Sequence, residues 1–358
     1  MIKKSFPLGL LLLSGAALVP TAQQWACACA PEPAERLFGK DQGETRAVLM
    51  IHKGKTAFRQ LAPGYTDETR FISWSMAKSV TAVLIGELVA DRKLALDAPV
   101  PFVEWQTPGD PRRAITLRQM LHMASGLEHN EGLDPKDGPD GARISDTVAT
   151  LFVDGTAAMA ATGIAKKLEA KPGSKFEYSS ITSLMLAELI TRQLTSSADP
   201  KTRALAYRQF AQERLFKPAG MTDVVMDFDG SGTQIGGSII YAPLDDWGRF
   251  GQLMLAGKGI AGDQVIAPDW LAFLRAPSPN DGNYGGHFWL NRPGPGGVNT
   301  SLFPGKGPDT IFAAIGHLGQ WVIISPDQDL ILVRLGKTND GDLAPVRAAL
   351  GDVVASVE

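Results

Sequence analysis

The strongest constraint on the fold is that β-prone segments lie at both ends of this 358-residue chain, with helical patterns between them. Near the start, residues 47–51 and 56–61 are short β-prone runs around a glycine, which predicts a hairpin. Near the end, residues 320–324 and 330–335 are rich in β-branched side chains and flank a Pro-Asp-Gln-Asp turn, which predicts a second hairpin. Strands at both ends imply one sheet domain that is split by a helical insertion.

Apolar residues at three- and four-residue spacing predict the helices. One helix follows residue 75, where a single apolar face is formed by Val80, Val83, Leu84 and Leu88. Further helices are predicted near 181–194, 244–256 and 343–354, and residues 132–141 form a Gly/Pro/Asp loop. We therefore expect a mixed α/β (α+β) chain with an α/β domain at 31–97 plus 235–358, a helical domain at 98–234, and a crevice between them.

Residues 1–30 have the pattern of a secretory signal peptide. Lys3 and Lys4 precede an apolar stretch at 6–19, and small residues then surround Cys27 and Cys29 in two small-x-small cleavage patterns. The stretch is too short and too often interrupted by glycine and proline for a transmembrane span. Lipid anchoring is the less favoured alternative, because the residues before each cysteine lack the usual leucine. We expect a periplasmic or secreted protein, without stable membrane insertion after cleavage.

The composition limits the kind of partner. Hydrophobic residues form 44% and charged residues 20% of the chain, which excludes a disordered chain and a polytopic membrane protein. The 35 basic and 38 acidic side chains leave no basic excess for a nucleic acid, so we expect a small-molecule partner. Walker, dinucleotide-binding, G-x-S-x-G and H-E-x-x-H motifs are absent, so no metal or cofactor is expected. The sequence leaves the oligomeric state open.

The clearest chemical signal is the pair of Ser75 and Lys78 at the start of the first apolar helix. Residues three apart share a helix face, so the lysine can reach the serine hydroxyl. A hydroxyl is a poor nucleophile until a base takes its proton, and burial at the positive end of a helix lowers the pKa of a lysine enough for that task. The same helix start offers a backbone N–H to an attacked carbonyl, which is half of an oxyanion hole.

The same residues also fit plain structural roles. Ser75 can be an N-cap and Lys78 a solvated side chain, because a serine and a lysine at this offset occur by chance in a chain of this length. Tyr178 precedes the predicted helix at 181–194, where a tyrosine can project into a crevice and shuttle protons beside an ammonium. Tyr178 equally fits a packed aromatic side chain, and Ser180 a plain N-cap.

Three motifs in sequence order resemble those of the serine β-lactamase and D,D-peptidase superfamily: Ser75-x-x-Lys78, Tyr178-x-Ser180 and Gly316-His317-Leu318-Gly319-Gln320. The pattern is most similar to the class C β-lactamase-related hydrolases, which include family VIII esterases and 6-aminohexanoate-dimer hydrolases. Segments at 115–127, 215–221 and 246–253 also resemble the family. The likeness therefore covers nearly the whole chain after the signal peptide.

The resemblance implies an antiparallel sheet flanked by helices, a mostly α-helical second domain, and an active site between them. It implies that Ser75 is the nucleophile and Lys78 its base or proton relay. It also implies that Tyr178 protonates the leaving group and later activates water. These three roles are expectations from the resemblance, and the helix geometry argued above agrees with the first two.

The resemblance also assigns four residues to substrate binding. Ser180 stands where many relatives have asparagine, and His317 begins a strand triad that is often Lys-Thr-Gly. The main-chain N–H groups of Ser75 and Gln320 would form the oxyanion hole, and Gly319 would allow substrate to approach the strand closely. An imidazole is mostly uncharged at neutral pH, and serine lacks the amide of asparagine, so both departures weaken the case for penicillins as substrates.

We therefore expect a secreted serine hydrolase that acts on small esters or linear amides through an acyl-enzyme on Ser75. Two alternatives stay open: a β-lactamase or D,D-carboxypeptidase acting on cell-wall-like amides, and a non-catalytic penicillin-recognising or sensor domain. The joint presence of serine, lysine and tyrosine speaks against the second. Glu131 is a candidate contact in a cleft-side loop, while His129, His122 and His52 are expected to be structural or surface residues.

Overall fold

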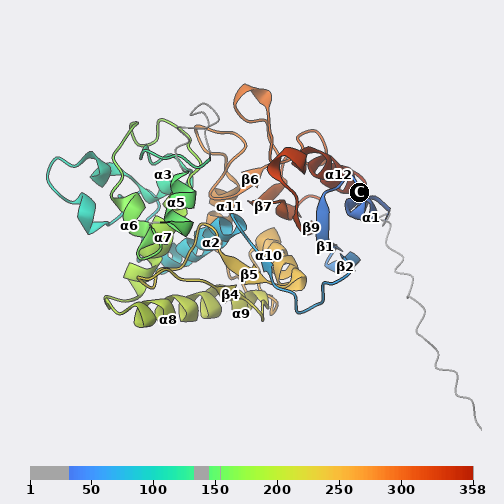
Figure 1. Cartoon of the computed structure of the whole chain (residues 1–358), viewed down its shortest axis with the longest axis horizontal. Coiled ribbons are helices and arrows are strands. Elements are labelled where there is room, and N and C mark those ends of the chain that lie inside the picture. Colours follow the sequence, from blue (N-terminus) through green and yellow to red (C-terminus); the bar gives the residue numbers. More distant parts are fainter. Residues whose placement is uncertain (1–31, 133–144, 154, 358) are drawn as a thin grey trace, which may run out of the picture.

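The computed structural model describes residues 32–132, 145–153 and 155–357, so the expected signal peptide and both cysteines lie outside the described residues. A six-stranded antiparallel sheet forms one side of the protein (Figure 1). From one edge to the other its strands are β2 (Lys55–Leu61), β1 (Glu44–His52), β9 (Leu330–Lys337), β8 (Gln320–Ser325), β7 (Phe312–Gly316) and β6 (Trp289–Leu290). Both ends of the chain thus build one sheet, and the expected fold class is confirmed.

Each face of the sheet has its own apolar core, because successive side chains of a strand point to opposite faces. Helix α10 (Leu244–Ala256) covers one face, and α12 (Leu343–Ala355) packs on the other together with α1 (Glu32–Glu35). Alternate residues of β1 reach the two cores: Leu49 and Ile51 on the α10 side, Val48 and Met50 on the α12 side. The sheet therefore gives the site a rigid wall.

Helix α2 (Met76–Ala90) connects this sheet to a helical region, at left in Figure 1, and nearly all of its residues are buried. It contacts β7 and β8 on the sheet side and α7 (Ser180–Leu194) on the helical side. The first residues of α2 and α7 therefore lie near the boundary between the two regions. None of the helices in the described residues is long and apolar enough to cross a membrane.

The other elements are short. The remaining helices are α3 (Leu117–Leu121), α5 (Asp146–Phe152), α6 (Met159–Ile164), α8 (Pro200–Ala211), α9 (Lys217–Ala219) and α11 (Pro268–Arg275). A second sheet of three strands has the order β3 (Phe71–Ile72), β5 (Ile240–Ala242) and β4 (Val225–Met226). Strand β3 ends three residues before Ser75 and so leads the chain directly into the start of α2.

Most long elements match the sequence-based predictions, and α10 begins and ends at the predicted residues. The main difference concerns the late hairpin. The structure adds β7 before it, and residues 317–319 form the turn between β7 and β8, with Leu318 at φ 58° and Gly319 at φ 80°. The expectation that the triad beginning at His317 lies on a strand is therefore wrong, since two successive residues with positive φ cannot continue an extended strand.

Candidate active site

Ser75 lies at the N-terminus of α2, and its hydroxyl faces Lys78 instead of capping the helix. The side chain makes no capping hydrogen bond, and its Oγ accepts a hydrogen bond from Lys78 Nζ at 2.8 Å. The preceding Trp74 has φ 45°, a left-handed conformation that is uncommon for a residue with a side chain. Backbone strain of this kind concentrates at functional sites. The side-chain N-cap interpretation of Ser75 is thus wrong.

Lys78 is buried, so the alternative of a solvated lysine is also wrong. Besides Ser75, its Nζ donates hydrogen bonds to Ser180 Oγ at 2.7 Å and to the main-chain oxygen of Gly237 at 2.7 Å. Burial lowers the pKa of Lys78 to about 8, although the negative charge of Glu131 opposes this shift. A lysine with this pKa is uncharged often enough near neutral pH to act as a base.

The ring of Tyr178 packs against the amine of Lys78, with the ring centroid 4.9 Å from Lys78 Nζ. It packs against the rings of Tyr284 and Trp289. Burial raises the pKa of Tyr178 well above its ordinary value, the charge of Glu131 adds to this rise, and a hydrogen bond with Ser75 works against it. The phenol is therefore protonated at neutral pH, so it can donate a proton before it accepts one.

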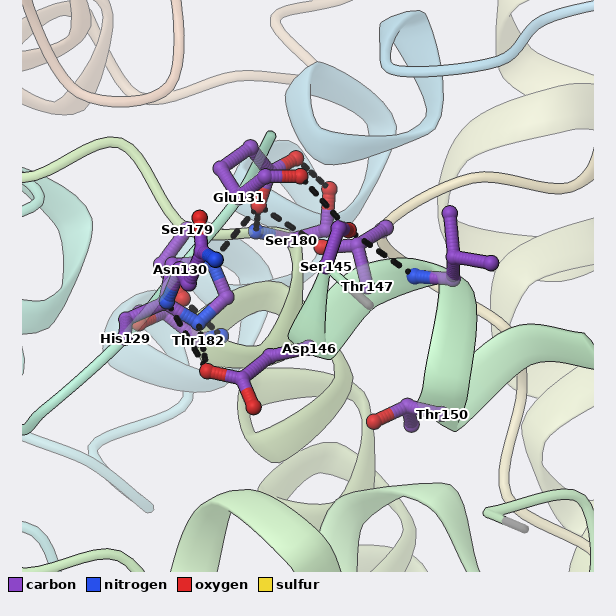
Figure 2. A network of polar contacts seen from close by, with 12 residues as sticks. His129, Asn130, Glu131, Ser145, Asp146, Thr147, Thr150, Ser179, Ser180 and Thr182 are labelled. Carbon is purple, nitrogen blue, oxygen red and sulfur yellow. Dashed lines mark hydrogen bonds and ion pairs between the residues drawn. The ribbon is translucent and has the colours of Figure 1, made fainter. Parts of the chain in front are cut away.

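Glu131 connects the loop at 129–131 to the start of α7 (Figure 2). Its carboxylate accepts hydrogen bonds from both the main-chain N–H and the hydroxyl of Ser180. His129 Nε2 lies 2.7 Å and Thr147 Oγ1 2.8 Å from the same carboxylate. Burial raises the pKa of Glu131, but the His129 contact, the charge of Lys78 and the Ser180 hydrogen bond outweigh it and hold the pKa at about 2. A half-buried carboxylate that is ionised at neutral pH thus stands behind the lysine.

Ser180 is the first residue of α7, whereas Ser179 caps this helix by accepting a hydrogen bond from Thr182 N at 3.1 Å. The plain N-cap interpretation of Ser180 is therefore wrong. Its hydroxyl is instead placed between Lys78 and Glu131. No motif in the sequence includes Glu131, and only the fold brings it to Ser180, which lies 49 residues further along the chain.

The end of β7 approaches the nucleophile closely. A Cβ atom on Gly316 would lie 2.1 Å from the main-chain oxygen of Ser73, so only glycine fits at this position. The next residue, His317, has its ring centroid 5.4 Å from that of Trp74, in an edge-on arrangement. Its Nδ1 lies 3.4 Å from Asp340 Oδ1, and half of the side chain is exposed. Gly316 and His317 therefore form the wall that faces Ser75.

Gln320 and Gly319 lie away from this wall. The Gln320 side chain is buried and clamps the hairpin to β9 by donating to Gly336 O at 2.6 Å and accepting from Gly336 N at 3.0 Å. Gly319 lies in the turn, where a Cβ would come within 2.5 Å of Arg334 Nη1. Neither residue lines the cavity beside Ser75. The expected roles of the Gln320 main-chain N–H in an oxyanion hole and of Gly319 in the approach of substrate stay predictions.

A cavity of about 810 Å³ opens at these groups. Ser75, Tyr178, Ser180, Glu131 and His317 reach its surface. Its walls combine aromatic and aliphatic side chains with a few polar ones, the apolar set being Trp74, Val148, Leu151, Phe152, Trp289, Ile315, Trp321 and Leu343. The arrangement is therefore a largely apolar cavity at which a serine hydroxyl, a buried amine and a phenol meet.

A buried helix that follows a serine and carries a lysine one turn on, set between a strand of the sheet and a tyrosine just before a second helix, defines the β-lactamase-fold class of serine hydrolases. The chain belongs to this family, because the sequence model described as Beta-lactamase matches residues 35–356. The match includes every residue of the site described above.

Solved structures share this fold over most of the chain. A Bacillus anthracis protein provisionally named 6-aminohexanoate-dimer hydrolase has 19% identity and a TM-score of 0.67, over 90% of this chain and 82% of that chain. A family VIII carboxylesterase has 14% identity and a TM-score of 0.64, over 91% and 97% of the two chains. A penicillin-binding protein homologue from Caulobacter crescentus has 16% identity and a TM-score of 0.64, over 91% and 96%. At these identities the likeness shows the fold.

Proposed function

We propose that this protein hydrolyses small esters or linear amides through an acyl-enzyme on Ser75. The observation that carries the proposal is the buried Lys78 amine, which lies 2.8 Å from Ser75 Oγ and has a pKa of about 8. An uncharged amine in contact with a hydroxyl accepts its proton as the hydroxyl oxygen attacks. Tyr178, held protonated beside the same serine, supplies the complementary acid.

In the acylation step, Ser75 Oγ attacks the carbonyl carbon of the substrate while its proton passes to Lys78 Nζ. We assign the stabilisation of the charge that develops on the carbonyl oxygen to the main-chain N–H groups of Ser75 and His317, because both residues line the cavity and Gln320, the partner that the resemblance implies, does not. Tyr178 donates its proton to the leaving alcohol or amine, the bond to that group breaks, and the proton on Lys78 restores the phenol. The acyl group remains on Ser75.

Deacylation repeats these transfers with water. The water oxygen attacks the acyl carbon and gives its proton to the Lys78–Tyr178 pair, and that proton returns to Ser75 Oγ as the acid leaves. Both half-reactions use the same groups, as expected for an enzyme that reverses the direction of proton transfer between steps. The contacts of Lys78 with Ser75 and with the Tyr178 ring support this proposal.

The polar end of the cavity supports an uncharged substrate. Where a Lys-Thr-Gly triad would present an ammonium, His317 is paired with Asp340, whose carboxylate also lines the cavity and would repel a substrate carboxylate. Arg347 lines the same cavity as a cation, and it favours the second candidate, a β-lactamase or D,D-carboxypeptidase acting on a carboxylate-bearing amide. The contacts joining Ser75, Lys78 and Tyr178 speak against a non-catalytic sensor.

Intact-mass measurement after treatment with an uncharged fluorophosphonate tests the nucleophile. We expect one adduct on Ser75, none on Ser75→Ala, and an unchanged adduct on the control Ser174→Ala, which removes an exposed hydroxyl. A panel of p-nitrophenyl esters, linear amides, a penicillin and a cephalosporin then tests the substrate class. Faster turnover of the two β-lactams than of every ester and linear amide would establish the second candidate instead.

We also propose export, which is supported by the signal-peptide pattern of residues 1–30. N-terminal sequencing of the protein from the periplasmic and culture fractions tests this directly. A mature start near residue 27 to 31 agrees with export, whereas an intact N-terminus in the cytosolic fraction would contradict it.

A further inference from the structure

Four polar side chains form one continuous line behind the nucleophile. Ser75 contacts Lys78, Lys78 contacts Ser180, and Ser180 contacts Glu131. The last member is a half-buried carboxylate with two further polar partners, His129 and Thr147 (Figure 2). Because each contact has a donor and an acceptor, the anion at one end can determine the direction of the hydrogen bonds at the other.

The directions follow from counting hydrogens. An ionised carboxylate can only accept, so the Ser180 hydroxyl donates its single hydrogen to Glu131 and must accept from Lys78. The main-chain oxygen of Gly237 can also only accept. An uncharged amine has two N–H groups and one lone pair. With both N–H groups used by Ser180 and Gly237, the lone pair is left facing Ser75 Oγ.

We propose that Glu131 is a positioning residue that, through Ser180, aims the lone pair of uncharged Lys78 at the hydroxyl of Ser75. This inference rests on the proposed function, in which Lys78 takes the proton of Ser75. It adds a role for a residue outside the three motifs, and it explains why a serine at position 180 can serve here: its hydroxyl relays the polarity of the carboxylate.

Replacing Glu131 by glutamine keeps the shape of the side chain but puts an N–H donor where a carboxylate oxygen accepted the hydrogen of Ser180. The main-chain N–H of Ser180 and the Thr147 hydroxyl both point at Oε2, so the amide oxygen must take that place and the NH2 group must face Ser180 Oγ. The Ser180 hydroxyl then loses its acceptor and can donate to the lone pair of Lys78. The amine is thereby turned away from Ser75.

The substitution also changes charge. The charged or titratable groups facing Glu131 are His129 from its own loop, Lys78 from α2, Tyr178 and the buried Tyr284, while Asp146 and its partner Lys166 lie beyond His129. Glu131 raises the pKa of both Lys78 and Tyr178. Losing the charge of Glu131 therefore lowers the pKa of Lys78 and of Tyr178. The rate of Ser75 modification then begins to rise at a lower pH than in the wild type.

The test measures the rate at which the uncharged fluorophosphonate modifies Ser75 across the pH range. We expect Glu131→Gln to lower the plateau rate by about 10- to 100-fold, the size of a misdirected hydrogen bond to a charged partner, and to move the midpoint downward. Ser180→Ala removes the hydroxyl that would compete, so we expect a smaller loss. The double variant should recover to the rate of Ser180→Ala. Glu128→Gln, an exposed glutamate in the same loop, is the matched control.

Recovery in the double variant is the decisive result, because a purely structural role for Glu131 would make the double variant as slow as Glu131→Gln or slower. A wild-type plateau and midpoint in Glu131→Gln would overturn the proposal. If thermal melts show that Glu131→Gln does not fold, Ser180→Ala decides, and a wild-type rate and midpoint there would equally overturn it. Failure of the wild-type protein to label at Ser75 would instead reject the proposed function itself, and this inference with it.

Discussion

Substituting Lys78 by methionine should change how the stability of the protein depends on pH. The folded protein holds the pKa of Lys78 at about 8 by burial, against 10.5 for an unperturbed lysine. Below pH 8 the amine is protonated in both the folded and unfolded states, so the burial cost of its charge is fully present. As pH rises from 8 to 10.5, the folded state loses its proton first and this cost disappears.

The magnitude follows from that interval. Each pKa unit corresponds to 1.36 kcal/mol, so a fall from 10.5 to about 8 corresponds to about 3 kcal/mol. Burial of the charged amine therefore lowers the free energy of unfolding by this full amount below about pH 8, and it no longer lowers it above pH 10.5. Methionine has a similar length and no titratable group, so the difference in unfolding free energy between wild type and Lys78→Met isolates this lysine.

Urea unfolding of both proteins at several pH values between about 7 and 10.5 measures the difference. We expect the free energy of unfolding of the wild type to rise by about 3 kcal/mol relative to Lys78→Met across this range. Lys93→Met, at an exposed position just after the same helix, controls for removing a lysine as such. A difference that stays constant, or that falls with rising pH, would refute the argument that Lys78 is buried as a destabilised ammonium.

Three further predictions concern activity. Lys78→Arg keeps a permanent charge, so the rise of hydrolysis through about pH 8 should be lost, as a pH–rate profile would show. Tyr178→Phe removes the acid and should slow p-nitrophenyl ester hydrolysis less than hydrolysis of an amide, whose leaving group needs the proton more; equal losses of about 100-fold would contradict this. Gly316→Ala places a Cβ against Ser73 O and should lower both kcat and the melting temperature, whereas Gly341→Ala, in open space, should not.

The sequence predicted the elements whose signals are local. Helix α2 has an uninterrupted apolar face, and the β8–β9 hairpin has both β-branched strands and a strong turn sequence. The contact between Ser75 and Lys78 could be predicted for the same reason, because residues three apart in one helix lie on the same face. Tyr178 needed the resemblance to the family, since nothing local says which aromatic residue will meet a helix more than a hundred residues earlier.

The late hairpin shows that a motif does not give the local conformation of its residues, even where the elements are predicted correctly. The resemblance placed Gly319 and the main-chain N–H of Gln320 beside substrate. Positive φ at both Leu318 and Gly319 makes a tight turn there, and neither Gly319 nor Gln320 lines the cavity beside Ser75. The motif thus extends from the end of β7 through the turn to the start of β8. The buried side chain of Gln320 then has a different task, clamping the turn to β9.

Glu131 illustrates a stronger limit. A lone glutamate in a polar loop has no periodicity, no motif and no fixed partner, and its importance arises only when the start of α7 brings Ser180 against it. The residue nevertheless constrains the lysine more than any local feature, because an acceptor-only group at the end of a line of hydrogen bonds fixes every direction along it. Sequence motifs identify the groups that exchange protons, and the groups that set the direction of exchange become visible only in three dimensions.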